Sequence, residues 1–331
     1  MRVLAVFKHY PTLSQTYKEN ELRALLPDHE VRIASIGGSK AMYRHHLPYD
    51  TIEQPADLDR ILAEFRPEVI HGHYLHQIDL LHEAAEKADV RFTLRTHSFD
   101  VLGLDDDDLR RWLPFVTSPR CAGILAFPFL AERLLKAGYP EDKVVEDWPV
   151  VQIDRFYDTS PNQEGILNMG ACIPKKNMPA YLALAQSMPD RRFSLCPIGF
   201  NTERLQDLNR RMGSPVTFHP TVEPAQMPAV YKQHDWLVYT ADRQLASVGW
   251  PMAIAEAQAS GLGILMQNIR PDLRQFIGPA GFLFDDIHEA RRILSQPYPQ
   301  EMREAGVAHC RKADIRRNIG KLTSRWADWH E

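Results

Sequence analysis

The segment V-I-H-G-H-Y-L-H-Q-I-D-L-L-H-E-A-A-E-K-A-D-V-R-F-T-L-R-T-H, Val69–His97, has the pattern of a strand, a helix and a second strand. Val69–His73 and Val90–Thr96 are short segments of the kind that form buried strands. Ile78–Lys87, between them, carries apolar residues at helical spacing. Two strands joined through a helix are parallel neighbours, so the segment predicts a βαβ unit of an α/β domain.

The same alternation of strands and helices extends in both directions from this segment. Expected strands are Val3–Phe7, Val31–Ile36, Gly123–Phe127, Lys143–Glu146, Ile166–Met169, Phe193–Pro197, Val216–His219, Trp236–Thr240, Gly263–Gln267 and Phe282–Phe284. One helix is expected to begin at Ser14. Further helices are expected over Ala56–Phe65, Asp105–Phe115, Leu130–Ala137, Asn177–Ser187, Arg204–Met212, Ala225–His234, Met252–Ser260, Asp272–Ile277 and in the chain from Ile287 to Trp329.

Two domains are expected from the length and from one break in this pattern. A chain of 331 residues is long for one core. The periodicity stops over the Pro-, Asp- and Ser-rich stretch Asp147–Glu164, which predicts a linker. We therefore predict two tandem Rossmann-like α/β domains facing across a cleft, residues 1–150 and 151–312, with a helix over 313–331 returning to the first. Neither domain has G-x-G-x-x-G after its first strand, which disfavours a dinucleotide-dependent enzyme.

Composition and charge exclude several classes of protein. With 44% hydrophobic and 25% charged residues, the chain is typical of a globular protein rather than a disordered one. No apolar run reaches the ~18 residues of a membrane span, and the four cysteines lack C-x-x-C spacing. Residues 1–155 carry 19 Lys+Arg against 25 Asp+Glu, and the rest 20 against 18. We expect a cytoplasmic protein with no nucleic-acid partner and at most weak contact with the inner face of a membrane.

Candidate site residues of the first half follow its strands, where α/β proteins bind ligands. The loop K-H-Y-P-T-L-S-Q-T contains Ser14 and Thr16, which can cap the next helix or leave its amides facing an anion. His71 and His73 end another strand. Two imidazoles without a carboxylate or cysteine at usable spacing favour a packed or cleft-lining pair over a metal site.

The segment T-H-S-F-D at the end of the Val90–Thr96 strand is a further candidate. His97 there can donate a hydrogen bond to a sugar hydroxyl or act as an acid or base, with Asp100 beside it. The acidic run Asp105–Asp108 fits the first turn of a helix, where carboxylates complement the helix dipole, better than a metal site.

The second half has two segments that suit an anionic ligand. Lys175 and Lys176 follow its first strand and precede a helix. Further on, V-G-W-P-M-A-I-A-E-A places Gly249, Trp250 and Pro251 in a tight loop before a helix. Glu256, on that mostly apolar helix, needs a polar partner such as a pair of ribose hydroxyls.

Taken in order, these motifs resemble those of the GT-B glycosyltransferases of family 4 along the whole chain. V-F-K-H-Y-P-T-L-S-Q-T is similar to the family's first loop, F-P-x-x-S-E-T, and T-H-S-F-D to its T-x-H-G-x-D. N-M-G-A-C-I-P-K-K-N resembles G-R-x-x-x-x-K-G, and V-G-W-P-M-A-I-A-E-A-Q-A-S-G resembles E-G-x-P-x-x-x-x-E-A-x-A-x-G. The resemblance implies that His97 reaches the donor sugar, Lys176 the diphosphate, Glu256 the ribose, and the amides of Gly249–Pro251 the phosphates.

Two positions depart from the family's pattern. Ala171 replaces an arginine, and Val248 replaces the first glutamate of the Glu-seven-residues-Glu pair. Lys175 or Arg243 can supply the missing positive charge, with Asp242 in place of the carboxylate. Alternatively the donor is a deoxy sugar that packs on Val248, or transfer has been lost while nucleotide binding is kept.

The resemblance implies a transferase that moves a sugar from a nucleoside-diphosphate sugar to a saccharide or lipid-linked saccharide, retaining, with neither a metal nor another cofactor. Such activity belongs to polysaccharide biosynthesis. A sugar-nucleotide epimerase of the same two-domain plan and a catalytically silent nucleotide-binding relative are the alternatives.

Overall fold

A computed structural model of the chain describes residues 1–12, 14–37, 46–199, 201–245 and 247–327. The chain forms two compact units by its internal contacts. The first unit is Met1–Val150 together with Ile315–Glu331, and the second is Val151–Asp314. The last segment therefore belongs to the first unit, and it starts at Ile315 where the sequence suggested 313.

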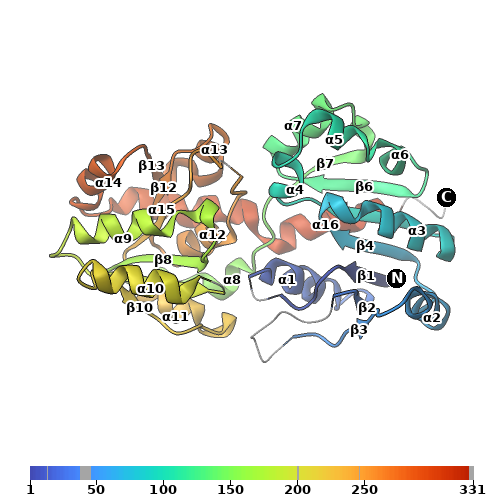
Figure 1. The fold of residues 1–331 in the computed structure, drawn as a ribbon, viewed down its shortest axis with the longest axis horizontal. Coiled ribbons are helices and arrows are strands. Elements are labelled where there is room, and N and C mark those ends of the chain that lie inside the picture. Colours follow the sequence, from blue (N-terminus) through green and yellow to red (C-terminus); the bar gives the residue numbers. More distant parts are fainter. Residues whose placement is uncertain (13, 38–45, 200, 246, 328–331) are drawn as a thin grey trace. The chain divides into compact units, whose positions relative to one another are not determined.

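The first unit is built on a parallel seven-stranded sheet of order β3-β2-β1-β4-β5-β6-β7 (Figure 1). Strands β1 and β4 lie at its centre, in register from Val3 opposite Val69 to Val6 opposite Gly72. The bounds are β1 Arg2–Phe7, β2 Glu30–Ser35, β3 Asp50–Thr51, β4 Val69–His73, β5 Arg91–Arg95, β6 Cys121–Ala126 and β7 Val144–Glu146.

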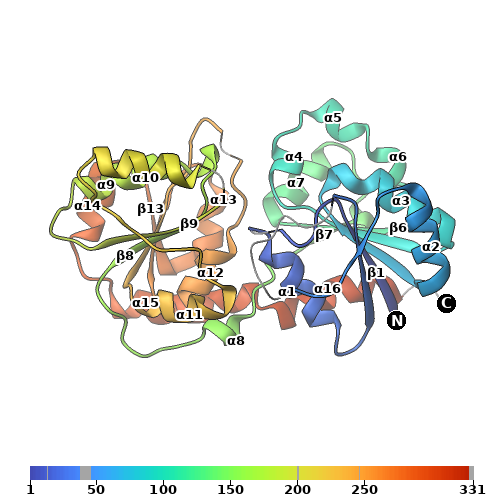
Figure 2. The same cartoon turned by 60° about the horizontal axis from the view of Figure 1, so that its bottom comes forward.

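Helices cover both faces of this sheet. Helices α1 and α16 lie on one face, and α2, α3 and α6 lie on the other (Figure 2). The bounds are α1 Thr16–Leu25, α2 Pro55–Phe65, η1 Leu75–Gln77, α3 Ile78–Ala88, α4 Phe99–Leu102, α5 Asp106–Arg110, α6 Leu113–Val116, α7 Pro128–Lys136, η2 Glu141–Lys143 and α16 Ile315–Ala327.

The second unit contains a parallel six-stranded sheet of order β10-β9-β8-β11-β12-β13. Helices α9, α10 and α14 cover one face, and α11, α12 and α15 cover the other (Figure 2). Its strands are β8 Ile166–Ala171, β9 Phe193–Ile198, β10 Thr217–Phe218, β11 Trp236–Tyr239, β12 Gly263–Gln267 and β13 Gly281–Phe284. Its helices are α8 Ile153–Phe156, η3 Pro174–Lys176, α9 Met178–Gln186, α10 Thr202–Arg211, η4 Pro224–Gln226, α11 Met227–Lys232, α12 Met252–Ala259, α13 Asp272–Ile277, η5 Gly278–Ala280, α14 Ile287–Leu294, α15 Gln300–His309 and η6 Cys310–Ala313.

Each sheet is stabilised by its own apolar core. In the first unit Leu322 and Trp326 of α16 pack with Val3, Val69 and Leu125 of the strands. In the second unit α9 and α14 bury Tyr181, Leu182 and Leu294 against the strands, in a cluster that includes Trp236. Burying a large apolar side chain stabilises the fold by about 1.5–3 kcal/mol, so α16 is a structural part of the first unit.

The predicted fold class, α/β with two tandem Rossmann-like domains, is confirmed, and several local expectations are corrected. The helix expected over Asp105–Phe115 is two short helices, α5 and α6, because Pro114 at the start of α6 has no amide to continue α5. The expected linker Asp147–Glu164 contains α8. The end of the expected helical region, Trp329, lies outside the described residues.

No helix in the described ranges is both long and apolar enough to cross a bilayer. The four cysteines are free and buried.

Candidate functional site

The strand order of each sheet marks where a ligand would bind. In the first unit the chain moves outward from β1 to β2 and then returns to β4, on the other side of β1. In the second unit the same reversal falls between β8 and β11. Open α/β sheets bind ligands outside the carboxyl ends of the strands at such reversals. The loops after these four strands therefore define the candidate site of each unit.

A hydrogen-bond network of Glu21, His71, His73 and His97, called here the histidine–glutamate network, lies at the carboxyl ends of β4 and β5. Oε1 of Glu21, on α1, is 2.6 Å from Nε2 of His71 and 3.1 Å from Nε2 of His73. Nδ1 of His73 is 3.0 Å from Nε2 of His97. The sheet register places His71 opposite Thr93 and His73 opposite Arg95, so these side chains share one face of the sheet.

Arg95 connects this network to a second carboxylate. Its Nε donates to Oε2 of Glu21 at 2.6 Å, and its Nη1 donates to Oδ2 of Asp147 at 2.8 Å. Nζ of Lys321, on α16, lies 3.5 Å from Oδ1 of Asp147. Two carboxylates and two cations therefore balance in charge, while Glu21, Arg95 and Asp147 are 0–3% exposed.

The pKa values of the network follow from burial and from this pairing. Burial alone would raise the pKa of Glu21, but Arg95 and the two histidines lower it well below its usual range. Burial lowers the pKa of His73 to about 3, although Glu21 opposes the shift. Burial, followed by the nearby His73 and Arg95, lowers the pKa of His97 well below 6.5. Glu21 is therefore ionised at neutral pH, and His73 and His97 are neutral.

His97 is partly exposed and is packed among aromatic rings. Its ring centroid lies 4.2 Å from that of Tyr17 and 4.6 Å from that of Tyr74, and the hydroxyls of these two tyrosines are hydrogen-bonded. The carboxylate of Asp100 accepts from the amides of Leu75, His97 and Ser98 at 2.9–3.1 Å. Asp100 is 3% exposed and thus fixes the loop that carries His97. A direct role for Asp100 in acceptor binding stays a prediction.

Glu21, His71 and His73 also present three potential metal ligands within 4.8 Å of one another. The sequence argument against a metal here assumed that no carboxylate was near, and that assumption is wrong because α1 supplies Glu21. The charges nevertheless favour hydrogen bonding. Arg95 occupies the second oxygen of Glu21, and a divalent ion would add two buried positive charges to a set that is already neutral. The absence of a resident metal stays a prediction.

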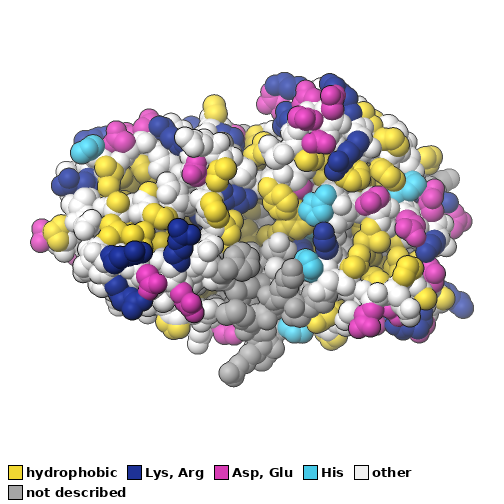
Figure 3. Space-filling model, viewed as in Figure 1, with side chains coloured by type: hydrophobic (Ala, Val, Ile, Leu, Met, Phe, Trp, Pro, Cys, Tyr) yellow, Lys and Arg dark blue, Asp and Glu magenta, His cyan; other side chains and the backbone are white. Residues whose placement is uncertain are grey.

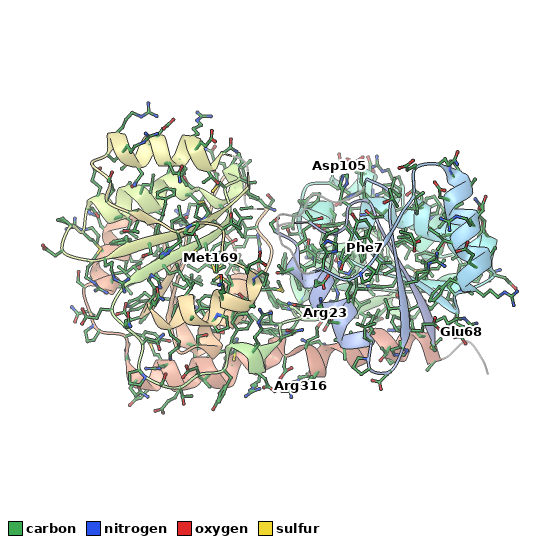
Figure 4. The ribbon with its side chains drawn as sticks, turned by 90° about the horizontal axis from the view of Figure 1, so that it is seen from below. Phe7, Arg23, Glu68, Asp105, Met169 and Arg316 are labelled. Atoms are coloured by element: carbon green, nitrogen blue, oxygen red, sulfur yellow. The ribbon has the colours of Figure 1, made fainter. Side chains whose placement is uncertain are left out.

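Lys18 is a buried cation of a different kind. It is 2% exposed, its Nζ donates to the carbonyl of His9 at 3.0 Å, and it lies 4.9 Å from the ring centroid of Phe7. Phe7, the last residue of β1, is labelled inside this unit in Figure 4. Burial lowers the pKa of Lys18 to about 7, and no carboxylate pairs with it in the part of the chain that the structure describes.

The loop after β1 differs from the sequence prediction in its cap. Helix α1 begins at Thr16 and its N-cap residue is Gln15, so Ser14 does not cap it. Ser14 is exposed and Thr16 is half-buried. The loop is held to the end of β4 by the amide of Lys8, which donates to Oε1 of Gln77 at 2.9 Å. The expected contact of Ser14 and Thr16 with a ligand stays a prediction, and position 13 of this loop lies outside the described residues.

In the second unit, Lys176 is the last residue of η3, the turn that follows β8. Gly170 has φ +120°, and a Cβ there would fall 2.1 Å from Nζ of Lys176, so glycine makes room for the ammonium. Burial, followed by the charge of Lys175, lowers the pKa of Lys176 to about 8. Its Nζ is 5.3 Å from the ring centroid of Tyr239, and no carboxylate pairs with it among the described residues.

The loop after β11 is tied to the lysine loop. Thr240 donates its hydroxyl to the carbonyl of Lys176 at 2.8 Å, and the amide of Asp242 donates to the carbonyl of Lys175 at 2.9 Å. Nζ of Lys175 donates to the carbonyl of Ser247 at 3.2 Å. The two loops at the β8–β11 reversal therefore form one hydrogen-bonded corner of the unit.

Arg243 and Asp242, proposed to replace the missing charges, have local partners. Arg243 pairs with Asp285 and donates to the carbonyl of Asn268 at 3.1 Å. Oδ1 of Asp242 accepts from the amides of Gln244 and Leu245 at 2.8 and 3.1 Å. Arg243 is therefore directed to the β12–β13 side. The second carboxylate oxygen of Asp242 makes no hydrogen bond in the described part of the chain.

The segment Val248–Pro251 is fixed by a pair that the sequence reasoning missed. Arg270 binds both oxygens of Asp272 at 2.8 and 3.1 Å and donates to the carbonyl of Val248 at 2.6 Å. Nε1 of Trp250 donates to Asp272 at 2.8 Å. Trp250 is 3% exposed and supports this segment by packing. Pro251 is the N-cap residue of α12, and its side chain cannot accept a hydrogen bond from the first amides of that helix.

Glu256 has a polar partner, as its position requires, but that partner is a protein side chain and not a ligand. The hydroxyl of Tyr231 donates to Oε2 of Glu256 at 2.7 Å and also lies 3.0 Å from Sδ of Met169, labelled in Figure 4. Glu256 is 9% exposed, and burial raises its pKa. Within the described residues no hydrogen bond reaches its other oxygen, Oε1, so binding of a ribose by Glu256 stays a prediction.

The acidic run is used as expected. Asp105 caps α5 by accepting from the amide of Asp108 at 2.8 Å, and Arg110 and Arg111 pair with Asp107 and Asp108. Figure 3 shows acidic side chains gathered over α5 with basic side chains next to them. This surface is a solvated helix end with local ion pairs.

The sequence did contain a signal for the missed residues of the first unit. Helix α1 buries Lys18, Glu21, Leu22 and Leu25, which follow the i, i+3, i+4, i+7 spacing of one helix face. Two charged residues on an apolar stripe need buried partners. Alternation along β5 likewise places Thr93 and Arg95 on one face.

Comparison with known proteins gave structural matches only. No family model matches the sequence, and no curated protein matches it. The fold of Anabaena HepE, solved in complex with UDP and glucose, matches with a TM-score of 0.78 at 13% identity, covering 99% of this chain and 100% of that one. The lipopolysaccharide outer core galactosyltransferase WaaB in its apo form matches with a TM-score of 0.66 at 13% identity, covering 98% and 99%.

Sucrose-phosphate synthase from Thermosynechococcus elongatus matches with a TM-score of 0.73 at 13% identity over 98% of both chains. The chain has the GT-B fold. The likeness covers both units, and at 11–14% identity it establishes the architecture alone.

Proposed function

We propose that this protein is a glycosyltransferase that moves a sugar from a nucleoside-diphosphate sugar to a saccharide or lipid-linked saccharide acceptor. The observation that carries the proposal is Lys176. Its ammonium lies at the strand reversal of the second unit, beside a glycine that makes room for it, and no carboxylate of the described residues neutralises it. A cation kept without a counter-charge at a ligand-binding position is suited to an anionic ligand.

The structural neighbours support this choice of ligand. HepE has been solved with UDP, with UDP and glucose, and with UDP-glucose, and it matches this chain along its whole length. WaaB and sucrose-phosphate synthase carry the names of sugar-transferring enzymes. We infer that the second unit holds the donor and the first unit holds the acceptor.

The proposed chemistry needs no enzyme nucleophile and no metal ion. The bond between the anomeric carbon and the diphosphate breaks, the acceptor oxygen bonds to that carbon, and the acceptor proton passes to the leaving phosphate. Negative charge grows on the diphosphate, where Lys176 and the uncapped amides at the start of α12 would stabilise it. His97 would position the sugar, and the reaction would retain the anomeric configuration.

Two residues of the same corner are the candidates to replace the charges missing at Ala171 and Val248. Lys175 lies beside Lys176, and Asp242 has one carboxylate oxygen without a hydrogen bond in the described part of the chain. Val248 is 3% exposed, which leaves little of its side chain to pack against a deoxy sugar. We therefore favour Lys175 and Asp242 as the substitutes and a fully hydroxylated donor.

One observation favours a catalytically silent nucleotide-binding protein as the second candidate. With Ala171 and Val248 in place of two charged groups, the site holds fewer ligand contacts, each worth about 1.5–3 kcal/mol when made to a charged group. In that case the protein would bind a nucleoside diphosphate tightly and release no product. The variant Val248→Glu would then create turnover, whereas with Asp242 as substitute it would add little.

A donor screen tests the proposal. Uridine, guanosine, adenosine and thymidine diphosphate sugars are incubated with the protein and a panel of saccharides, and nucleoside diphosphate release and saccharide mass are measured together. The proposal predicts a saccharide product that requires protein and is lost in Lys176→Ala. Lys136→Ala, an exposed lysine of the first unit, is the matched control and should keep full activity. An isomerised sugar nucleotide without a saccharide product would show an epimerase instead.

A further inference from the structure

We propose that Glu21, acting through His73, fixes the tautomer of His97 so that Nδ1 of His97 accepts a hydrogen bond from a ligand hydroxyl. Glu21 and His73 are then positioning residues, and the two ring nitrogens of His97 have fixed roles as donor and acceptor. The assignment of that hydroxyl to a sugar rests on the proposed function. The tautomer itself rests on the hydrogen bonds of the first unit and on the neutral state of His73 and His97.

The direction of the hydrogen bonds is set first at Glu21. An ionised carboxylate accepts hydrogen bonds and donates none, and Oε2 already accepts from Nε of Arg95 at 2.6 Å. Oε1 is 3.1 Å from Nε2 of His73, so this nitrogen must carry the hydrogen. The guanidinium of Arg95, together with His71 and His73, keeps Glu21 ionised.

The polarity then passes through His73 to His97. A neutral imidazole has one N–H group, so His73, which is 1% exposed and donates from Nε2, offers a lone pair at Nδ1. Nε2 of His97 lies 3.0 Å from that lone pair and must therefore be the donor. Because His97 is also neutral, its Nδ1 is a bare acceptor nitrogen. No hydrogen bond to Nδ1 occurs within the described ranges.

A bare Nδ1 selects among ligand groups. It accepts from a hydroxyl or an amine, and it repels the lone pairs of a carboxylate or a carbonyl oxygen. The rings of Tyr17 and Tyr74 pack 4.2 and 4.6 Å from the His97 ring, centroid to centroid, and hold its plane. The site is thus suited to a neutral polyhydroxy compound at this position.

A metal ion at Glu21, His71 and His73 would give the opposite result. Coordination through Nε2 would place the hydrogen of His73 on Nδ1, His97 would accept at Nε2, and its own hydrogen would move to Nδ1. The tautomer of His97 therefore distinguishes the hydrogen-bonded network from a metal-bound one.

Nitrogen NMR of the full chain tests the tautomer directly. With ¹⁵N-labelled histidine and chelator-treated protein at pH 7.5, His97 should show a protonated Nε2 and a bare Nδ1, assigned by its loss in His97→Asn. In His73→Phe, which keeps a ring in place and leaves Glu21 paired with Arg95 and His71, the two nitrogens of His97 should move toward averaged shifts. A protonated Nδ1 in the wild type would overturn the proposal.

A pair of variants tests the consequence for activity. His73→Phe removes the acceptor for His97 and should lower kcat/KM about 10- to 50-fold, the size of one lost hydrogen bond in a dry site. His73→Asn loses the same bond to Glu21 but places an amide oxygen near the former Nδ1, and should recover at least half of the loss on a logarithmic scale. Equal defects in both variants would indicate a structural role and contradict the proposal.

The two tests fail in different ways. If no donor is turned over while the wild-type tautomer is as predicted, the proposed function is wrong and the network assignment holds. If sugar transfer occurs with a protonated Nδ1 on His97, the function holds and this inference is wrong.

Discussion

The two units differ in how the charges at their strand ends are paired. In the first unit the carboxylates of Glu21 and Asp147 are balanced by Arg95, through hydrogen bonds of 2.6–2.8 Å, and by Lys321. In the second unit no carboxylate of the described residues pairs with Lys176, while Glu256 accepts one tyrosine hydroxyl and the charge of Arg155 opposes the rise of its pKa. The charges of the first arrangement are paired without a ligand, although Nη2 of Arg95 makes no hydrogen bond within the described ranges, whereas Lys176 of the second would gain a counter-charge from an anionic ligand.

This difference suggests that the first unit orients a side chain and the second unit supplies affinity for a ligand. A network whose charges are paired in the free protein holds a side chain such as His97 in one orientation. A charge without a partner reduces the stability of the free protein, and we propose that Lys176 gains energy from an anionic ligand and so contributes affinity. Substitutions should therefore have opposite effects on stability in the two units.

The largest effect is expected from breaking the balanced network. Glu21→Ala leaves Arg95 buried with one carboxylate instead of two and should destabilise the first unit by about 3–5 kcal/mol. Urea unfolding followed by circular dichroism measures the loss. Glu64→Ala, an exposed glutamate paired with Arg32 and Arg60, is the control and should leave the unfolding midpoint nearly unchanged. Equal midpoints for Glu21→Ala and the wild type would refute the structural role of the network.

The second effect concerns affinity without loss of stability. Lys176→Ala should weaken binding of a nucleoside diphosphate about 10- to 100-fold, because one charged hydrogen bond is lost. Its free energy of unfolding should stay the same or rise, since a desolvated ammonium is removed. Calorimetric titration gives the affinity, and thermal unfolding gives the stability. A strongly destabilised variant would show that Lys176 is a structural residue.

The third effect concerns Lys18, which breaks the pattern of the first unit. Its folded pKa is about 7, below the unfolded value, so the unfolded chain binds more protons and the lysine costs stability at neutral pH. Lys18→Met should therefore raise the free energy of unfolding by roughly 1–3 kcal/mol at pH 6.5. The gain over wild type should shrink as the pH rises from 7 toward 10. A gain that is independent of pH would indicate packing instead.

The sequence predicts the sheets of this fold better than it predicts the site. Strands Val69–His73 and Gly263–Gln267 are found at the expected residues, and the second has the nearly continuous apolar segment that buried parallel strands need. Short elements such as α4 and α8 were missed because single turns have no periodicity.

Long-range pairing explains what the sequence could not show at the site. His71 and His73 were recognisable as candidates, but Glu21 lies 50 residues from His71 along the chain and reaches it from a helix. In the same way Arg270 fixes Val248 over 22 residues. Neither partner follows from local spacing, and the partners of Arg243 and Glu256 are likewise set by neighbouring strands and helices.

The central claim is that the second unit keeps an unneutralised lysine for a diphosphate. The most direct measurement is calorimetric titration of UDP, GDP, ADP and TDP at pH 8.5 in two buffers of different ionisation enthalpy. Because the pKa of Lys176 is about 8, with Lys175 and Tyr239 facing it, the ammonium is partly deprotonated there and an anion should raise its pKa. The account predicts one site per chain for at least one nucleotide, proton uptake on binding that is absent in Lys176→Ala, and weaker binding as the pH rises from 7 to 9. Lack of binding by all four nucleotides, or binding with equal affinity and proton uptake in Lys176→Ala, would contradict it.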